Sequence, residues 1–299
     1  MPTTVTASLD RTLHAARNLG RIINAFGKAN LHSDEYAGAQ PLGIYFEGPF
    51  LNVIRRGAQP AAQIRKPSVA ILARLLGAAG GAARALALAP ELDGALTLLK
   101  TARMRGICVG IGHSDATFED TESAISAGAT HAVHLYNAMR PFAHRDPGVV
   151  GAVLTDGRVS AELICDGVHV EPAAVRLAVM AKGLEKLILV SDSVSAAGMP
   201  DGSYRLGSVT VQVSKGVCRT ASGNLGGSTI TLDVALRNLV RFTGRNYREC
   251  LPCATLNPAR LLGLEKQKGV IAPGADADLA LLDHDYHVTQ TYVRGRQVL

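Results

Sequence analysis

The sequence predicts a parallel α/β fold, and specifically a (β/α) TIM-like barrel. Short apolar runs alternate with amphipathic stretches along most of the 299 residues, as strands and helices do in a parallel sheet. No GxGxxG phosphate loop follows any of these runs, so we favour a barrel over an open doubly wound sheet. Polar residues follow several runs, at the positions where the active site of a barrel lies.

Five apolar runs are predicted as strands because each is short and is followed by a polar or Gly-rich turn and then by a helix-like segment. These strands are 42–46, 107–111, 132–135, 160–164 and 187–190. Six segments are predicted as helices, several of them opened by Ser, Thr, Asp or Pro. These helices are 9–26, 69–76, 92–103, 117–127, 172–181 and 230–242.

The texture of the sequence changes after about residue 203. Short alternating segments (204–213) and a Gly-rich loop (223–228) follow, and the stretch from Gly269 onward alternates like an all-β appendage. We therefore expect a barrel domain that is followed by a small β unit. No internal repeat or low-complexity linker divides the chain.

Composition limits the partners that we expect. With 47% hydrophobic and 19% charged residues, the chain can bury one large core. Aromatic residues make up only 4% and Trp is absent, so we expect no nucleic-acid partner that would need stacking surfaces. The net charge of +6 comes from scattered Lys and Arg, which fits a solvated basic surface as well as an anionic ligand.

We expect a cytoplasmic protein without a membrane partner. The apolar stretch 68–90 is interrupted by Arg74, Arg84 and three glycines, and no signal peptide is visible at the start. Five Cys at irregular spacing suit a reduced compartment. Cys250 and Cys253 have CxxC form, but no second CxxC or His pair completes a zinc site, so we interpret them as packing residues.

Three residues supply the ligands of a catalytic type of metal site. Glu47, His113 and His134 each stand at or near the end of a predicted strand, and together they offer one carboxylate and two imidazoles. This set suits Zn²⁺ or a similar divalent ion with a position left open for water. Taken singly, each His could equally be a core or helix-capping residue, and it is the combination that favours the metal.

Two further residues could act beside such an ion. Asp192 follows the predicted strand 187–190, where a carboxylate could serve as general base and then protonate a leaving amine. The alternative is that Asp192 caps the next helix. His169 could polarise a carbonyl or stabilise a developing oxyanion, and its alternative is a surface loop position.

A series of motifs makes the interpretation more specific. In sequence order they are Glu47-Gly48-Pro49-Phe50-Leu51-Asn52, Gly112-His113-Ser114, His134-Leu135-Tyr136-Asn137-Ala138-Met139, Arg145-Asp146-Pro147-Gly148, Asp166-Gly167-Val168-His169 and Ser191-Asp192. In that order they resemble the motifs of the N-acetylglucosamine-6-phosphate deacetylase family of the amidohydrolase superfamily. The resemblance covers most of the chain and continues through 224–229 to 257–260 and 274–279.

The resemblance implies a role for each residue of the candidate metal site. Glu47, His113 and His134 would bind a divalent metal ion, with Zn²⁺ expected; we expect one ion and leave a second open. Asp192 would be the base and acid. His169 would contact the acetamido carbonyl.

The resemblance also implies the ligand and the reaction. The chain would hydrolyse N-acetylglucosamine 6-phosphate to glucosamine 6-phosphate and acetate, in amino-sugar catabolism or cell-wall recycling. Arg145 and backbone amides at 137–138 would hold the sugar phosphate, since a guanidinium and N–H groups suit a phosphate. Family members are usually homodimers. The substrate-binding residues implied are Gln59, Asn137, Ala138, Arg145, His169, Leu225, Gly226 and Gly227.

The chain departs from the superfamily pattern at its N-terminus. Members begin with half of a small β-sandwich and with a first barrel strand that ends in a His-x-His or related motif, whereas segment 2–6 resembles the second strand. We therefore expect a barrel domain over 1–268 that lacks its first strand, and a remnant of an incomplete β-sandwich over 269–299. A start site assigned too far downstream, a disrupted gene and completion by a second polypeptide are three explanations.

Two single positions also depart from the family. Tyr45 stands where the family often has His, and Gln59 stands where it usually has His. Because Gln59 is expected near the substrate, a related sugar phosphate such as N-acetylgalactosamine 6-phosphate is an alternative substrate. The missing first strand leaves a noncatalytic remnant as a further alternative.

Overall fold

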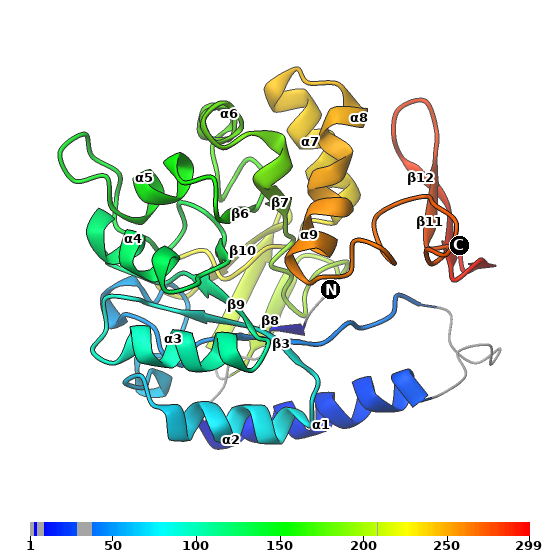
Figure 1. Cartoon of the computed structure of the whole chain (residues 1–299). Coiled ribbons are helices and arrows are strands. Elements are labelled where there is room, and N and C mark those ends of the chain that lie inside the picture. Colours follow the sequence, from blue (N-terminus) through cyan, green and yellow to red (C-terminus); the bar gives the residue numbers. More distant parts are fainter. Residues whose placement is uncertain (1–2, 5–8, 29–37, 208) are drawn as a thin grey trace.

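The computed structural model describes residues 3–4, 9–28, 38–207 and 209–299. Strands and helices alternate up to about residue 190, and two small antiparallel sheets and further helices follow (Figure 1). The strands are β1 (Thr3–Thr4), β2 (Ile44–Glu47), β3 (Ala83–Leu88), β4 (Cys108–Ile111), β5 (His131–Ala132), β6 (Ser160–Leu163), β7 (Leu187–Leu189), β8 (Gly202–Leu206), β9 (Val209–Ser214), β10 (Val217–Thr220), β11 (Leu279–Leu282), β12 (Val288–Val293) and β13 (Arg296–Gln297).

The helices lie mainly between the strands of the parallel sheet. The α-helices are α1 (Leu9–Lys28), α2 (Val69–Ala79), α3 (Ala95–Met104), α4 (Phe118–Ser126), α5 (Gly148–Thr155), α6 (Pro172–Lys182), α7 (Leu232–Thr243), α8 (Tyr247–Cys250) and α9 (Leu256–Leu261). The 3-10 helices are η1 (Val53–Arg55), η2 (Ala61–Gln63), η3 (Leu184–Lys186) and η4 (Leu251–Ala254). No helix of the described residues has the length and apolar character that crossing a membrane requires.

Strands β1 to β7 form one parallel sheet in which each strand pairs with the next along the chain. A helix lies in every connection, from α1 between β1 and β2 to α6 between β6 and β7. This sequential order is that of a TIM-like barrel and confirms the predicted fold class. Within the described residues, β1 and β7 are the two edges of the sheet.

Local sequence signals define where several helices begin and end. Helix α2 starts after Ser68, whose hydroxyl accepts a hydrogen bond from the N–H of Ile71, and it ends at Gly80 with a φ of 57°. Helix α4 starts after Thr117 in a capping box with Asp120. These caps satisfy N–H groups that the first helical turn leaves unpaired.

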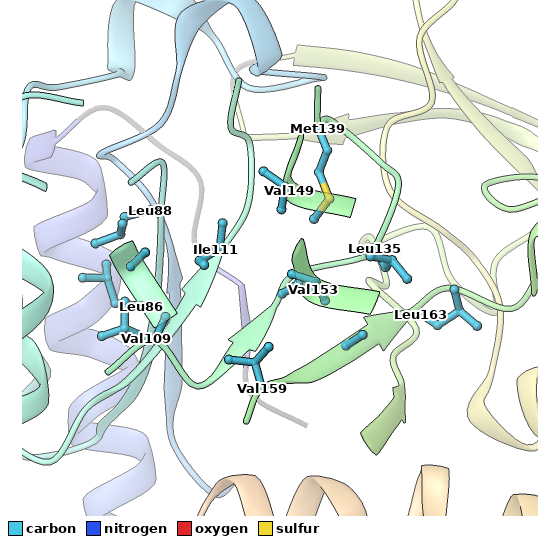
Figure 2. Packing of buried hydrophobic residues seen from close by; sticks show 14 of the residues in the cluster. Leu86, Leu88, Val109, Ile111, Leu135, Met139, Val149, Val153, Val159 and Leu163 are labelled. Atoms are coloured by element: carbon cyan, nitrogen blue, oxygen red, sulfur yellow. The ribbon is translucent and has the colours of Figure 1, made fainter. Parts of the chain in front are cut away.

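The main core lies between the parallel sheet and its helices. Leu86 and Leu88 of β3 and Val109 and Ile111 of β4 are fully buried, and Figure 2 shows them with apolar residues of the neighbouring segments. Leu72 of α2 closes the same cluster from the helical side. Such dense packing holds the strands rigidly, so the residues at their carboxyl ends are placed with little freedom.

The two antiparallel sheets differ in how well they are covered. Strands β8, β9 and β10 have a small core of their own that includes Val211, Val213 and Cys218. Strands β11, β12 and β13 lie to one side of the helices (Figure 1), and none of the residues 264–299 is buried. The expected incompleteness of this appendage and the domain boundary at 268/269 stay predictions.

Most predicted elements are present with small changes of boundary. All five predicted strands and all six predicted helices overlap observed ones. The strand predicted at 132–135 is shorter and begins one residue earlier, so His134 lies after β5 and not inside it. Strand β3 and helix α5 were not predicted. Of segment 2–6, which resembles the second strand of the family, only Thr3 and Thr4 are among the described residues. They form β1, which pairs with β2 in parallel.

Replacing Gly110 of β4 with Ala is expected to destabilise the barrel. A Cβ there would lie 2.6 Å from Nε2 of His131 and 2.8 Å from the hydroxyl of Tyr45, which leaves no room for a methyl group. We expect the free energy of unfolding to fall by about 1–3 kcal/mol in chemical denaturation, as for overpacked cores. Gly157→Ala is the control, because its Cβ meets no atom within 4 Å. Equal stability of the two variants would contradict this packing.

Candidate active site

The candidate site lies at the carboxyl ends of the parallel strands. Glu47 is the last residue of β2, and His113, His134 and Asp192 follow β4, β5 and β7 by two or three residues. The φ angles of these three residues are 50°, 32° and 43°, a region that residues other than glycine seldom adopt. All four residues line one cavity, and local backbone strain of this kind clusters at functional sites.

Glu47, His113 and His134 bring three ligand atoms together. The Oε1 atom of Glu47 lies 2.8 Å from Nε2 of His113 and 3.0 Å from Nε2 of His134, and the two Nε2 atoms are 3.1 Å apart. Potential ligand atoms of all three residues lie within 4.8 Å of one another. Since imidazole and carboxylate lone pairs converge here, a cation between them satisfies all three, and the donor set fits a divalent metal ion.

Charge coupling within this cluster is strong. Burial raises the pKa of the Glu47 carboxyl, but the charge and hydrogen bonds of His113 and His134 outweigh it and hold that pKa far below its usual range. Burial lowers the pKa of His134, but its hydrogen bond to Glu47 and the charge of Glu47 outweigh it and raise the pKa to about 9. The cluster thus favours positive charge beside Glu47, which a bound cation supplies.

The two imidazoles are oriented differently. Nδ1 of His113 lies 2.9 Å from the carbonyl oxygen of Arg55, so the backbone fixes this ring with Nε2 toward Glu47. Nδ1 of His134 is buried and has no hydrogen-bond partner among the described residues. Within the described part of the chain, the His134 ring therefore makes its hydrogen bonds through Nε2, on the side where the ligand atoms converge.

Asp192 and His169 face the same cavity of about 480 Å³. Burial, together with the charge of Glu47, raises the pKa of the Asp192 carboxyl, so a group suited to accept and return a proton lies beside the metal ligands. His169 is nearly buried, with 7% of its side chain exposed. The structure thus brings together the five residues predicted for metal binding and catalysis, and their roles stay predictions.

Most of the predicted substrate-binding residues also surround this cavity. Its lining includes Gln59, Asn137, Ala138, His169, Leu225, Gly226 and Gly227. Among the described residues that form the lining, Arg145 is not found; its Nη1 atom lies 2.9 Å from Nε2 of the exposed His144. The predicted contact of Arg145 with a substrate phosphate stays a prediction.

The segment after His134 is locked by its own hydrogen bonds. The backbone N–H of Asn137 donates to the carbonyl of His134 over 3.0 Å, and the side-chain amide donates to the carbonyls of His134 and Leu135. Ala138, the next residue, has a φ of 51°, and both residues line the cavity. The binding of a sugar phosphate by the backbone amides at 137–138 stays a prediction.

The side chain of Gln59 hydrogen-bonds one of the candidate metal ligands. Its Nε2 atom donates to Oε2 of Glu47 over 3.1 Å, while Oε1 of the same carboxylate faces the two imidazoles. Gln59 was predicted to bind substrate, and it lines the cavity. This hydrogen bond shows that its side chain also orients the Glu47 carboxylate. It leaves one carboxylate oxygen of Glu47 for the metal.

Sequence reasoning missed a buried polar layer formed by Tyr45, His131 and Glu162. Nε2 of His131 lies 2.6 Å from the Tyr45 hydroxyl and 3.4 Å from Oε1 of Glu162. Burial raises the pKa of Glu162 to about 8 and lowers that of His131 to about 3. A carboxylate in the apolar run 160–164 was the available signal, since charged residues are seldom buried without a partner.

Glu91 is a further polar-network residue that was not predicted from the sequence. Its Oε1 accepts from Nδ2 of Asn52 and from the N–H of Asp115, and its Oε2 accepts from the hydroxyl of Ser114. The residues that follow His113 are thus tied to the same carboxylate as Asn52. Nothing in the local sequence distinguishes Glu91 from a surface residue of the loop after β3.

Comparison with known proteins gives the family. A family model described as the amidohydrolase family matches residues 22–298. This chain belongs to the amidohydrolase family. Its members act through divalent metal ions, which agrees with the ligand set of Glu47, His113 and His134.

Several relatives within this family are similar over nearly the whole chain. An N-acetylgalactosamine-6-phosphate deacetylase of Escherichia coli O157:H7 is 43% identical over 296 residues, which cover 99% of this chain and 76% of the relative. An N-acetylglucosamine-6-phosphate deacetylase of Lysinibacillus sphaericus is 38% identical over 296 residues, covering 99% and 74%. The resemblance that the motifs carry is therefore confirmed, and the chain spans about three quarters of these relatives.

Solved structures give the same result for the fold. A mutant of N-acetyl-D-glucosamine-6-phosphate deacetylase from Mycobacterium smegmatis, in complex with N-acetyl-D-glucosamine-6-phosphate, matches with a TM-score of 0.91 and 38% identity. The match covers all of this chain and 76% of that one. The corresponding enzyme of Thermotoga maritima matches with a TM-score of 0.90 and 34% identity, covering 100% and 78%.

The contact of Gln59 with Glu47 can be tested through metal affinity. We expect Gln59→Ala to raise the dissociation constant of Zn²⁺ about tenfold, because Glu47 loses the donor that orients it. Isothermal titration of the metal-free chain measures this without any substrate. Asn224→Ala is the control, because Asn224 lines the same cavity but hydrogen-bonds Ser222. An unchanged affinity in Gln59→Ala would show that this contact does not support the metal ligand.

Proposed function

We propose that this chain is a metal-dependent deacetylase that hydrolyses N-acetyl-D-glucosamine 6-phosphate to D-glucosamine 6-phosphate and acetate. The observation that carries the proposal is one cavity in which a ligand set of one carboxylate and two imidazoles lies beside a buried carboxylate. The deacetylase relatives at 38–43% identity support the substrate class. The motifs that carry the resemblance all lie in the part of this chain that these relatives match.

The metal would be held by Glu47, His113 and His134. One carboxylate and two imidazoles suit Zn²⁺, and a single ion fits the three convergent ligand atoms. When bound, such an ion polarises the amide carbonyl and makes water a stronger nucleophile at neutral pH. The residues of the chain supply the remaining functions, which are proton transfer and substrate orientation.

Asp192 is the proposed general base and acid. Its burial beside Glu47 raises its pKa, so the carboxylate readily accepts the proton of the attacking water. The same proton is then delivered to the amine nitrogen as the C–N bond breaks, which releases an amine and acetate. His169, on the wall of the same cavity, would contact the acetamido carbonyl.

Substrate orientation is assigned to the loops around the cavity. Asn137, Ala138 and the Gly-rich segment 225–227 line it, and their backbone N–H groups would suit a phosphate. Arg145 does not line this cavity, so its guanidinium would reach the phosphate after a movement of its segment, or the Arg145 of a second copy would enter the cavity in the proposed homodimer. We also propose that the protein is located in the cytoplasm.

A deacetylase of N-acetylgalactosamine 6-phosphate is the second candidate. It is favoured by the relative of that name at 43% identity and by Gln59 at a position where the family usually has His. The two sugars differ only in the configuration at one ring carbon, so the same site chemistry serves both.

Acetate release by the purified chain tests the proposal and its rival together. We expect turnover of N-acetylglucosamine 6-phosphate that a chelator abolishes and Zn²⁺ restores, because the amide is activated at the metal. N-acetylgalactosamine 6-phosphate in parallel assays decides between the two sugars through the ratio of kcat/KM. Unphosphorylated N-acetylglucosamine is the control for the phosphate. A folded, metal-loaded chain that releases acetate from none of them would contradict the deacetylase.

Asp192→Asn is expected to abolish turnover while leaving the metal content unchanged. The amide keeps the shape of the side chain but cannot accept the proton of water, and loss of a general base costs about 10²–10⁴ in kcat. Metal content is read by elemental analysis and kcat by acetate release. Asp285→Asn is the matched control, since that carboxylate is exposed on the appendage. Retained activity in Asp192→Asn would rule out this mechanism.

A further inference from the structure

Asp166 hydrogen-bonds both the ring and the backbone of His169. Its Oδ2 lies 2.6 Å from Nδ1 of the His169 ring, and its Oδ1 accepts from the backbone N–H groups of Val168 and His169, each over 2.8 Å. Both side chains are nearly buried, with 14% and 7% exposed. Burial raises the pKa of Asp166, but the hydrogen bonds from His169 and Val168 outweigh it, so the pKa lies below its usual value and the group is a carboxylate.

This pairing decides which nitrogen of His169 carries a proton. A carboxylate only accepts hydrogen bonds, so Nδ1 of the ring must be protonated. The other nitrogen, Nε2, is the one left for the cavity that His169 lines. In neutral His169 with the proton on Nδ1, Nε2 accepts a hydrogen bond; it donates one only when the ring is the imidazolium.

Asp166 is also connected to the loop that carries Asp192. The hydroxyl of Ser228 lies 3.4 Å from Oδ2 of Asp166, and Ser228 is only 3% exposed. The N–H of Ser228 donates to the carbonyl of Asp192 over 2.9 Å, and its own carbonyl accepts from the N–H of Val194. Asp166 therefore contacts both His169 and Ser228, whose backbone hydrogen bonds hold the loop that carries Asp192.

We propose that Asp166 is a positioning residue that keeps the proton of His169 on Nδ1 and turns Nε2 toward the substrate. This inference rests on the proposed function for its catalytic consequence, but the proton position itself is a property of the chain alone. The arrangement resembles in its logic the buried carboxylate that fixes the tautomer of a catalytic His in other hydrolases.

A purely structural role for Asp166 is the competing explanation. Its Oδ1 closes a turn through the N–H groups of Val168 and His169, and a turn of that kind stabilises a loop whatever the His ring does. The two roles use different oxygens. A variant that keeps the turn and changes only the atom facing Nδ1 separates them.

Asp166→Asn is that variant. Its Oδ1 can still accept from both backbone N–H groups, and this fixes the side-chain NH₂ opposite Nδ1, where it donates instead of accepting. We expect a folded protein with unchanged metal content in which the His169 proton moves from Nδ1 to Nε2. We expect kcat to fall about tenfold or more, the size that follows when a hydrogen bond to a charged group is lost.

The proton position is measured by NMR of the ¹⁵N-labelled imidazoles, with His169→Gln to assign the signals. Asp283→Asn is the matched control, because Asp283 accepts from two backbone N–H groups and lies 3.4 Å from Nδ1 of His287, but on the exposed appendage. It should leave the His169 signals and kcat unchanged. Unchanged His169 signals in Asp166→Asn, or changed signals with wild-type kcat, would overturn the positioning role.

The wild-type chain alone provides a second measurement in case Asp166→Asn does not fold. Its His169 must show a protonated, hydrogen-bonded Nδ1 whether or not a substrate is present; a bare Nδ1 refutes the proposal. If Nδ1 is protonated but the wild-type chain releases no acetate from any sugar phosphate, the proposed function fails and the orientation of His169 by Asp166 stands.

Discussion

The convergence of one carboxylate oxygen with two imidazole nitrogens is the constraint on which the rest of the site depends. Oε1 of Glu47 lies within hydrogen-bond distance of Nε2 of both His113 and His134, and both histidines are 5% exposed. Three potential ligand atoms so close together suit a divalent metal ion. The parallel sheet makes this possible, because β2, β4 and β5 end on the same side and the packed core fixes their spacing.

Polar groups behind the ligands support this arrangement. Gln59 donates a hydrogen bond to the second carboxylate oxygen of Glu47, and the carbonyl oxygen of Arg55 lies within hydrogen-bond distance of Nδ1 of His113. In the layer of Tyr45, His131 and Glu162, Nε2 of His131 lies between the Tyr45 hydroxyl and the Glu162 carboxyl, and its Nδ1 contacts the hydroxyl of Thr130. A buried polar layer of this kind tolerates little change, since one missing partner leaves another group unsatisfied. Tyr45, a departure from the family, is therefore matched to its own surroundings.

The sequence predicted the strand ends better than it predicted the contacts among them. The residue types at Glu47, His113 and Asp192 and the alternation of apolar runs sufficed to place the site at one face of a barrel. Helix α5 was missed because it is buried on all sides and shows no amphipathic period. Strand β3 was missed because its Ala-rich sequence lacks β-branched residues. The contact between Gln59 and Glu47 depends on the path of a loop, which no local pattern encodes.

The strained backbone at the strand ends explains how loops of different origin act as one site. His113, His134 and Asp192 all have positive φ angles, and each accepts a backbone hydrogen bond at its own carbonyl. The donors to His113 and Asp192 are the N–H groups of Asn52 and Ser228 in other loops, each over 2.9 Å, whereas the donor to His134 is the N–H of Asn137 in the same loop, over 3.0 Å. Strain of this kind persists only where the surroundings over-determine it. The backbone of the site is therefore held by hydrogen bonds within and between loops, and a bound metal would add to an order that the chain already has.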